Sequence, residues 1–256
     1  MKALKSLKEM NNLFWAIQFL TIIPVSPRFH EKEKQLSSSV IYFPLVGLLL
    51  GLVLVALNII ISQIFISQIL ISAILVITLA ILTGALHLDG LADTFDALGS
   101  RKNKEGFLEV LRDPQVGTMG ALSLVCVILL KILILSTLSS QARNLALILM
   151  CVLSRWSIML PIYSFPYARK IGKAEEFFAG FKLMVFIPVT LLVLIFTILI
   201  LSWKGLFIFT TVLLFTFLFN KFINKKIDGI TGDILGATLE LNEVIILICM
   251  AAIFGV

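Results

Sequence analysis

The sequence has few charged residues and few cysteines for its length. Of its 256 residues, 14% are charged and 59% are hydrophobic, whereas a globular domain averages about 25% charged and about 45–50% apolar residues. This composition argues against a soluble protein with a single core, and it excludes an intrinsically disordered chain. The cysteines Cys126, Cys151 and Cys249 lie inside apolar runs without metal-type or redox-type spacing, which excludes a disulfide scaffold. An integral membrane protein with several spans is left.

Long apolar runs fill most of the chain and predict an all-α, polytopic membrane helix bundle. A transmembrane helix needs roughly 20 mostly apolar residues, and no residue between Lys34 and Asp89 carries a fixed charge. Polar residues between positions 58 and 68 divide that stretch, as the tip of a hairpin would. We therefore expect about seven spans in a single domain, 1–256. The expected spans lie near residues 40–61, 67–87, 118–138, 144–163, 183–202, 205–221 and 235–255.

The N-terminal segment, residues 1–39, resembles a signal peptide only in part. Lys2, Lys5 and Lys8 precede an apolar stretch, but the prolines and small residues at 24–27 do not form a cleavage site. We therefore expect an interfacial or re-entrant segment on the cytoplasmic side of the membrane.

The distribution of the 21 Lys and Arg residues predicts the orientation of the chain. The N-terminal segment and the loops after spans two, four and six hold most of them, whereas the other loops hold only Arg143 and Lys204. The positive-inside rule then places the N-terminus and the cation-rich loops in the cytoplasm. The 15 acids, which this rule does not use, lie in or beside the same loops or inside the last span. We expect a cell-membrane protein whose active site faces the cytoplasm, and we expect no nucleic-acid partner.

Three aspartates follow the second span, in the segment His87-Leu-Asp89-Gly90-Leu-Ala-Asp93-Thr-Phe-Asp96. Their spacing of i, i+4 and i+7 places Asp89, Asp93 and Asp96 on one face of a helix. Three carboxylates on one stripe repel each other unless a cation neutralises them, and hard oxygen ligands suit Mg²⁺. A solvated acidic start of a helix is the alternative, because aspartates favour the positive end of the helix dipole. His87 lies off this stripe, and Gly90 allows close approach to it.

A second polar segment, Arg112-Asp113-Pro114-Gln-Val-Gly117-Thr-Met-Gly120, precedes the third span. Pro114 ends the preceding element, and Gly117 and Gly120 allow a backbone to approach a ligand closely. The guanidinium of Arg112 is suited to bidentate phosphate binding. An ordinary turn into the span is equally compatible with these residues.

Ionisable residues inside the spans form a third group. Asp233 and Glu240, seven residues apart, share a helix face, and Glu243 follows them. An ionised group at a span centre costs about 2.5–3.5 kcal/mol on insertion scales. These acids therefore need partners or a wet cavity. Arg155 has the same need, so we expect it to pair with one of the glutamates or to meet a substrate phosphate. Lys131 is expected to extend toward the membrane surface.

Acids, glycine turns and arginines on one side of the membrane predict Mg²⁺-dependent phosphoryl chemistry at the membrane surface. Such chemistry depends on positioning and charge neutralisation more than on a covalent intermediate. The sequence has neither a P-loop nor a Ser, His and Asp order typical of hydrolases. A transporter is the competing class, because it requires ionisable groups near the bilayer midplane.

At these residues the chain resembles the cobalamin synthase family, that is, the adenosylcobinamide-GDP ribazoletransferases. The resemblance is strongest from residue 87 to residue 98 and covers nearly the whole chain in order. Its other segments are 18–24, 43–47, 112–122, 153–156 and 231–237. The CDP-alcohol phosphotransferases fit poorly, because their acidic motif carries an arginine soon after the first Asp-Gly, where this chain has Ala92 and Asp93.

The resemblance implies a multi-pass membrane enzyme that uses Mg²⁺. It would join adenosylcobinamide-GDP to α-ribazole or its 5′-phosphate, giving adenosylcobalamin or its 5′-phosphate and GMP. The alternatives are an alcohol phosphotransferase for another nucleotide-activated substrate and a transporter, and the oligomeric state is left open. The residue roles are our own inference for this chemistry: the metal ligands would be Asp89, Asp93 and Asp96; the catalytic residues Asp93, Asp233, Glu240 and Arg155; and the substrate-binding residues His87, Arg112 and Asp113.

Overall fold

The structure is a computed structural model that describes residues 2–25, 32–169, 174–178 and 180–255. The described residues form helices joined by short connections, with one isolated parallel bridge between Tyr167 and Ile230. The expected all-α fold is therefore confirmed. The elements are α1 (Lys2–Leu20), α2 (Lys32–Ser39), the 3₁₀ helix η1 (Val40–Tyr42), α3 (Phe43–Ile61), α4 (Gln68–Leu82), α5 (Leu86–Gly99), α6 (Lys104–Val110), α7 (Thr118–Thr137), α8 (Ser140–Ser157), α9 (Met159–Ser164), α10 (Glu175–Phe178), α11 (Leu183–Leu201), α12 (Trp203–Ile227) and α13 (Gly232–Phe254).

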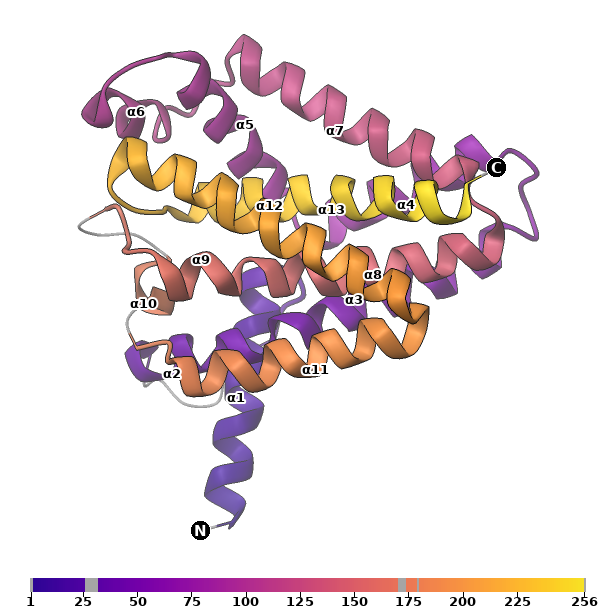
Figure 1. Cartoon of the computed structure of the whole chain (residues 1–256), viewed down its shortest axis with the longest axis horizontal. Helices are drawn as coiled ribbons and strands as arrows, with labels where there is room; N and C mark the ends of the chain where they lie inside the picture. Colours follow the sequence, from indigo (N-terminus) through magenta and orange to yellow (C-terminus); the bar gives the residue numbers. More distant parts are fainter. Residues whose placement is uncertain (1, 26–31, 170–173, 179, 256) are drawn as a thin grey trace.

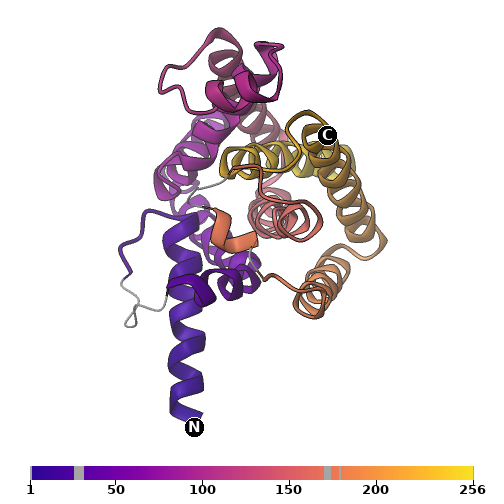
Figure 2. The same ribbon diagram turned by 90° about the vertical axis from the view of Figure 1, so that its left-hand side faces the viewer.

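The long helices run side by side in a bundle (Figure 1). Six stretches of the described chain are long and apolar enough to cross a membrane, or seven if α4 and α5 are counted as one bent span. The chain is thus a multi-pass membrane protein, as the sequence predicts. Figure 2, which views the bundle from one end, places α8 near its centre. Consistent with this position, 89% of the apolar window that contains α8 is buried inside the protein.

Small residues allow α8 to pack closely against α3. A Cβ atom on Gly47 would lie only 2.2 Å from the carbonyl oxygen of Cys151, and one on Gly51 would lie 2.9 Å from Cα of Ile148. Small residues commonly permit such backbone contact between membrane helices. The contact between α3 and α8 fixes the centre of the bundle.

The predicted span 67–87 is wrong at its second end. The helix stops at Leu82, and α5 leaves the corner at 90° to α4. Gly84 and Ala85 both have positive φ, 60° and 55°, a left-handed conformation that cannot continue an α-helix. The N–H of Ile22 donates to the carbonyl oxygen of Leu82 over 2.9 Å. The segment after α1 therefore stabilises the turn between α4 and α5.

The two ends of the bundle differ in their structures. One end holds α5, α6, α9 and α10 and the N-terminal ends of α7, α11 and α13, whereas the other holds the short turns between consecutive spans (Figure 1). This grouping matches the two sets of loops predicted from the charges. Arg143, however, is not a loop cation. It is buried, and its guanidinium donates to Asn58, Gln68 and the carbonyl oxygens of Leu135 and Leu138.

The first helix, α1, lies across the bundle helices and not along them (Figures 1 and 2). Its last turns contribute Ala16 and Leu20 to the buried core. This course is compatible with the interfacial segment expected for residues 1–39. The cytoplasmic location of the N-terminus stays a prediction.

Candidate active site

Helix α5 crosses the first turns of α13 at the end of the bundle that carries the short helices. Gly90 makes this crossing possible, because a Cβ atom there would lie 2.6 Å from the backbone oxygen of Asp233. Gly236 faces α5 from the other side, where a Cβ atom would lie 3.1 Å from the carbonyl oxygen of His87. Backbone contact of this kind brings Asp233 next to the aspartates of α5. Gly90 therefore serves the approach of a helix, which the sequence could not distinguish from the approach of a ligand.

The aspartates of α5 and α13 form what we call the acidic cluster. Burial, followed by the charges of the neighbouring aspartates, raises the pKa of Asp93 to about 7. Arg169 lowers this pKa but does not offset the acids. A bound cation would therefore be stabilised beside Asp93. The members of the acidic cluster are Asp89, Asp93, Asp96 and Asp233.

Asp96 differs from the other members because helix α7 holds its carboxylate. Its Oδ2 accepts the N–H of Gly117 and its Oδ1 accepts the N–H of Gly120, each over 2.7 Å. A Cβ atom on either glycine would lie 2.5 Å or less from a carboxylate oxygen. Gly117 and Gly120, expected to approach a ligand, instead form a cradle for Asp96, which lies at the positive N-terminal end of α7. Asp96 thus links α5 to α7 through these two hydrogen bonds.

Arg169 is a residue of the site that sequence reasoning missed. Its Nη2 donates to Oδ2 of Asp233 over 2.7 Å and to the carbonyl oxygen of Leu111 over 3.2 Å. The two charged side chains are 14% and 26% exposed. In the sequence, Arg169 is one of four cations in a loop and gives no signal beyond membrane orientation.

Backbone pairing explains why Arg169 reaches Asp233. The N–H of Ala168 donates to the carbonyl oxygen of Ile230 over 3.0 Å, and the N–H of Ile230 donates to that of Pro166 over 2.9 Å. Gly229 permits this pairing, since a Cβ atom there would lie 2.8 Å from the backbone of Ala168. The chain before Arg169 is thereby fixed beside the start of α13.

A cavity of about 520 Å³ opens beside this ion pair, a size within the range of small-molecule sites. Asp89, Asp233 and Arg169 give it a polar wall, and Phe19 and Tyr167 add aromatic surface. Elements distant in the sequence, α1, α5, α13 and the segment before α10, therefore meet around one space.

His87, predicted to bind substrate, also lines this cavity. Its side chain is 4% exposed, and its Nε2 has no hydrogen-bond partner among the described residues. The charges of Arg155, Glu243 and Lys131 also act on its ring. His87 therefore neighbours both the cavity and the buried charges of the bundle.

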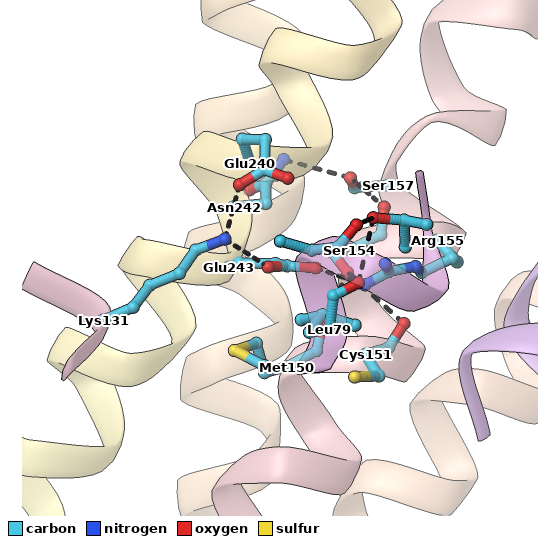
Figure 3. A network of polar contacts seen from close by, with 12 residues as sticks. Leu79, Lys131, Met150, Cys151, Ser154, Arg155, Ser157, Glu240, Asn242 and Glu243 are labelled. Carbon is cyan, nitrogen blue, oxygen red and sulfur yellow. Dashed lines mark hydrogen bonds and ion pairs between the residues drawn. The ribbon is translucent and has the colours of Figure 1, made fainter. Parts of the chain in front are cut away.

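Those buried charges form a second group, which we call the inner ionic cluster (Figure 3). Lys131 of α7 forms ion pairs with both Glu240 and Glu243 of α13, and Arg155 of α8 forms an ion pair with Glu243. None of these four side chains is more than 6% exposed. Two cations and two anions balance each other, as buried charges require. The inner ionic cluster comprises Lys131, Arg155, Glu240 and Glu243.

Three expectations about these residues have different outcomes. The predicted pair between Arg155 and a glutamate is confirmed, with Glu243 as the partner. The prediction for Lys131 is wrong, because this residue is buried and does not extend to the membrane surface. Glu240, expected at the reacting groups, does not line the cavity of about 520 Å³ and pairs with Lys131. Its seven-residue spacing from Asp233 separates them by about 10 Å along α13.

Arg112 and Asp113 lie on the exposed connection between α6 and α7. Oδ1 of Asp113 accepts the N–H of Gln115 over 3.0 Å, which is a local turn contact. Neither residue lines the cavity. The geometry favours the ordinary turn, and the cation that reaches the site is Arg169.

Comparisons with known proteins identify the family. The family model described as cobalamin-5-phosphate synthase matches residues 12–251. The chain belongs to this family. A relative from Desulfitobacterium hafniense (strain Y51), named adenosylcobinamide-GDP ribazoletransferase, is 35% identical over 94% of this chain and 96% of its own length. Relatives of the same name from Clostridium novyi (strain NT) and Fusobacterium nucleatum are 34% and 36% identical, over 96% and 92% of this chain and 98% and 95% of their own lengths. No solved structure matches the chain.

The acidic cluster presents oxygen donors for a metal ion without a closed protein cage. Within the described residues, no three His, Cys, Asp or Glu side chains are placed together to hold a metal. Mg²⁺ usually takes one or two carboxylates together with substrate phosphates and waters, so an open pair such as Asp89 and Asp93 fits it. The uncompensated negative charge around Asp93 supports this fit. Asp96 fits less well, because each of its oxygens already accepts a backbone N–H.

Proposed function

We propose that this chain joins adenosylcobinamide-GDP to α-ribazole or its 5′-phosphate, with GMP as the second product, in the last steps of cobalamin biosynthesis. The observation that carries this proposal is the acidic cluster at a cavity of about 520 Å³ in a chain of this family. A diphosphate would be repelled by the acids alone, and it binds there together with a divalent cation. The name shared by the relatives supports the choice of substrates.

The reaction is one phosphoryl transfer with one proton to place. A ribose hydroxyl oxygen of α-ribazole attacks the corrinoid-linked phosphorus of the diphosphate, and a new O–P bond forms. The bond from that phosphorus to the bridging oxygen breaks, and GMP leaves with that oxygen and the electron pair. Because the 5′-phosphate is retained when it is present in the substrate, the attacking hydroxyl is then a different one from the 5′-hydroxyl. Asp233, a carboxylate of the cavity, accepts the hydroxyl proton.

Positioning supplies most of the catalysis in this scheme. Phosphoryl transfer needs two reactants held in line and a neutralised charge more than it needs a covalent intermediate. The crossing at Gly90 and the cradle of Asp96 fix α5 against α13 and α7, so the carboxylates keep their places. Glu240 and Arg155 have no contact with the reacting atoms in this proposal.

Asp89, which lines the cavity, and Asp93, one turn further along α5 and outside the lining, would hold Mg²⁺ at its edge. When bound, Mg²⁺ supplies charge neutralisation for the diphosphate and the leaving phosphate. Asp96 would then act through α7 as a positioning residue.

We place the acidic cluster on the cytoplasmic side of the cell membrane. Helix α6, the segment before α10 and the last turns of α12 carry several Lys and Arg residues and lie at that end of the bundle, which supports this orientation. Single cysteines at Asn103 and at Gln63, introduced into a chain whose own cysteines are replaced by Ala, would test it in intact cells. An impermeant thiol reagent is expected to label position 63 only. Labelling of position 103 from outside contradicts the orientation.

The activity itself is tested with purified full-length protein in detergent, adenosylcobinamide-GDP and α-ribazole. We expect Mg²⁺-dependent release of GMP together with formation of adenosylcobalamin. Release of CMP from CDP-linked alcohol substrates alone would indicate another phosphotransferase. Movement of a corrinoid into sealed vesicles without any chemistry would indicate a transporter.

A further inference from the structure

Arg169 has hydrogen-bonding capacity that its contacts in the protein do not use. A guanidinium carries five N–H donors in a planar fork. In the described residues, Nη2 donates to Asp233 and to the carbonyl oxygen of Leu111, whereas Nε is buried and has no partner. A buried donor without an acceptor is costly. Since Arg169 lines the cavity, an acceptor on a bound ligand would satisfy this donor.

The ion pair between Arg169 and Asp233 also conflicts with the task proposed for Asp233. Oδ2 of Asp233 already accepts hydrogen bonds from Nη2 of Arg169 and from the hydroxyl of Thr231, so it is occupied before a substrate hydroxyl arrives. The pair lies 2.7 Å apart at the wall of the cavity, where phosphate oxygens of a bound nucleotide would compete for the same guanidinium. Planar, bidentate contact with phosphate is among the strongest hydrogen bonds available to arginine.

We propose that Arg169 exchanges Asp233 for a phosphate oxygen of the bound nucleotide diphosphate and thereby frees Asp233 to accept the hydroxyl proton. This inference rests on the proposed function and deepens it. Arg169 is the phosphate-binding residue of the cavity, and Asp233 is available as a base only after the substrate has bound. The carbonyl contact to Leu111 and the backbone pairing of Ala168 hold the arginine in place during the exchange.

Binding measurements with two probes separate this role from a structural one. Calorimetry on the detergent-solubilised full chain would use GMP, which carries a phosphate, and guanosine, which does not. For Arg169→Gln we expect GMP affinity to fall roughly 10- to 100-fold while guanosine affinity is unchanged. Arg169→Lys keeps the positive charge but loses the planar guanidinium. Its GMP affinity is expected to lie between that of Arg169→Gln and that of the wild type.

Asp233→Asn gives the sharpest signature of the exchange. In this variant Arg169 has no ion pair with residue 233 to break before it binds phosphate. GMP is therefore expected to bind at least as tightly as in the wild type. Turnover nevertheless falls by roughly 10²- to 10⁴-fold, because the proton acceptor is lost. Weaker GMP binding in Asp233→Asn overturns the proposed competition.

The matched control is Lys104→Gln, which breaks an exposed ion pair at the same end of the bundle. Lys104 lies 3.0 Å from Asp228, and the two side chains are 39% and 78% exposed. We expect this variant to keep wild-type binding and turnover. Equal GMP affinity in Arg169→Gln and the wild type overturns the inference. So does an Arg169→Gln variant that loses GMP and guanosine affinity equally together with its melting temperature. Wild-type protein that releases no GMP overturns the proposed function instead.

Discussion

Two groups of ionisable side chains lie along α13, and they differ in charge balance and in exposure. The inner ionic cluster has two cations and two anions, none more than 6% exposed. The acidic cluster has four carboxylates near a single arginine, and the Asp233 side chain in it is 26% exposed. Charges that water cannot reach must balance within the protein. Only the acidic cluster, beside a cavity, keeps an imbalance that a ligand or a cation can satisfy.

This difference assigns a structural role to the inner ionic cluster and a chemical role to the acidic cluster, although α13 contributes to both. The inner ionic cluster connects α7, α8 and α13 (Figure 3), and the acidic cluster lies where α5 crosses the first turns of α13. Variants in the two groups should therefore respond in different assays. The largest effect on stability is expected in the inner ionic cluster.

Glu243→Leu is expected to lower the free energy of unfolding by about 3–5 kcal/mol, because it leaves buried cations with too few acids. Glu243 contacts both Lys131 and Arg155, so this one change removes two ion pairs of the group and leaves both cations in place. Equilibrium unfolding of the purified protein in mixed micelles measures the loss. An unfolding free energy equal to that of the wild type would show that the pairs are not formed in the membrane.

A double variant, Lys131→Met with Glu240→Met, sharpens the same prediction. It removes one cation and one anion, leaves the pair of Arg155 and Glu243 in place, and keeps the volume similar. The expected loss is about 1 kcal/mol or less, because no charge stays unpaired. A loss as large as that of Glu243→Leu would show that packing, and not charge balance, dominates there.

Asp93→Asn is the counterpart in the acidic cluster and is expected to change stability least. Burial, followed by the charges of the neighbouring acids, raises the pKa of Asp93 from 3.8 to about 7, so the free energy of unfolding falls as the pH rises from about 4 to about 7. At pH 8 the amide removes this repulsion, and the unfolding free energy should be unchanged or slightly higher, within ~0.5 kcal/mol. A clear loss of stability would indicate a structural role for Asp93.

The sequence predicted the parts of the fold and site that depend on local pattern. Apolar runs located the spans, and the spacing of Asp89, Asp93 and Asp96 located one face of α5. The sequence also singled out Asp233, although only the structure shows how Gly90 and Gly236 bring it to α5. Hydrophobic periodicity and residue spacing are properties of single helices, so they can be read from the sequence without knowing how the helices pack.

The parts that were missed depend on contacts between distant segments. Nothing near Ala85 in the sequence requires a positive φ, so the corner that ends α4 was not visible. Lys131 resembles a cation that reaches the membrane surface until two glutamates of α13 face it. Arg169 acquires its role only through the pairing of its segment with Ile230. The partner of a side chain depends on the tertiary structure, and spacing along the chain does not specify it.

The proposed mechanism requires that Asp89 and Asp93 of α5 hold a divalent cation beside Asp233 of α13, and metal-directed cleavage tests this most directly. Fe²⁺ replaces Mg²⁺ in the purified protein, and ascorbate with peroxide then generates hydroxyl radicals that cut the nearest backbone. We predict cuts near residues 89–93 and near residues 232–234 in the same molecules, suppressed by excess Mg²⁺ and lost in Asp93→Asn. Cuts confined to one of these segments, or cuts that Asp93→Asn leaves unchanged, would contradict a metal site on α5 next to Asp233.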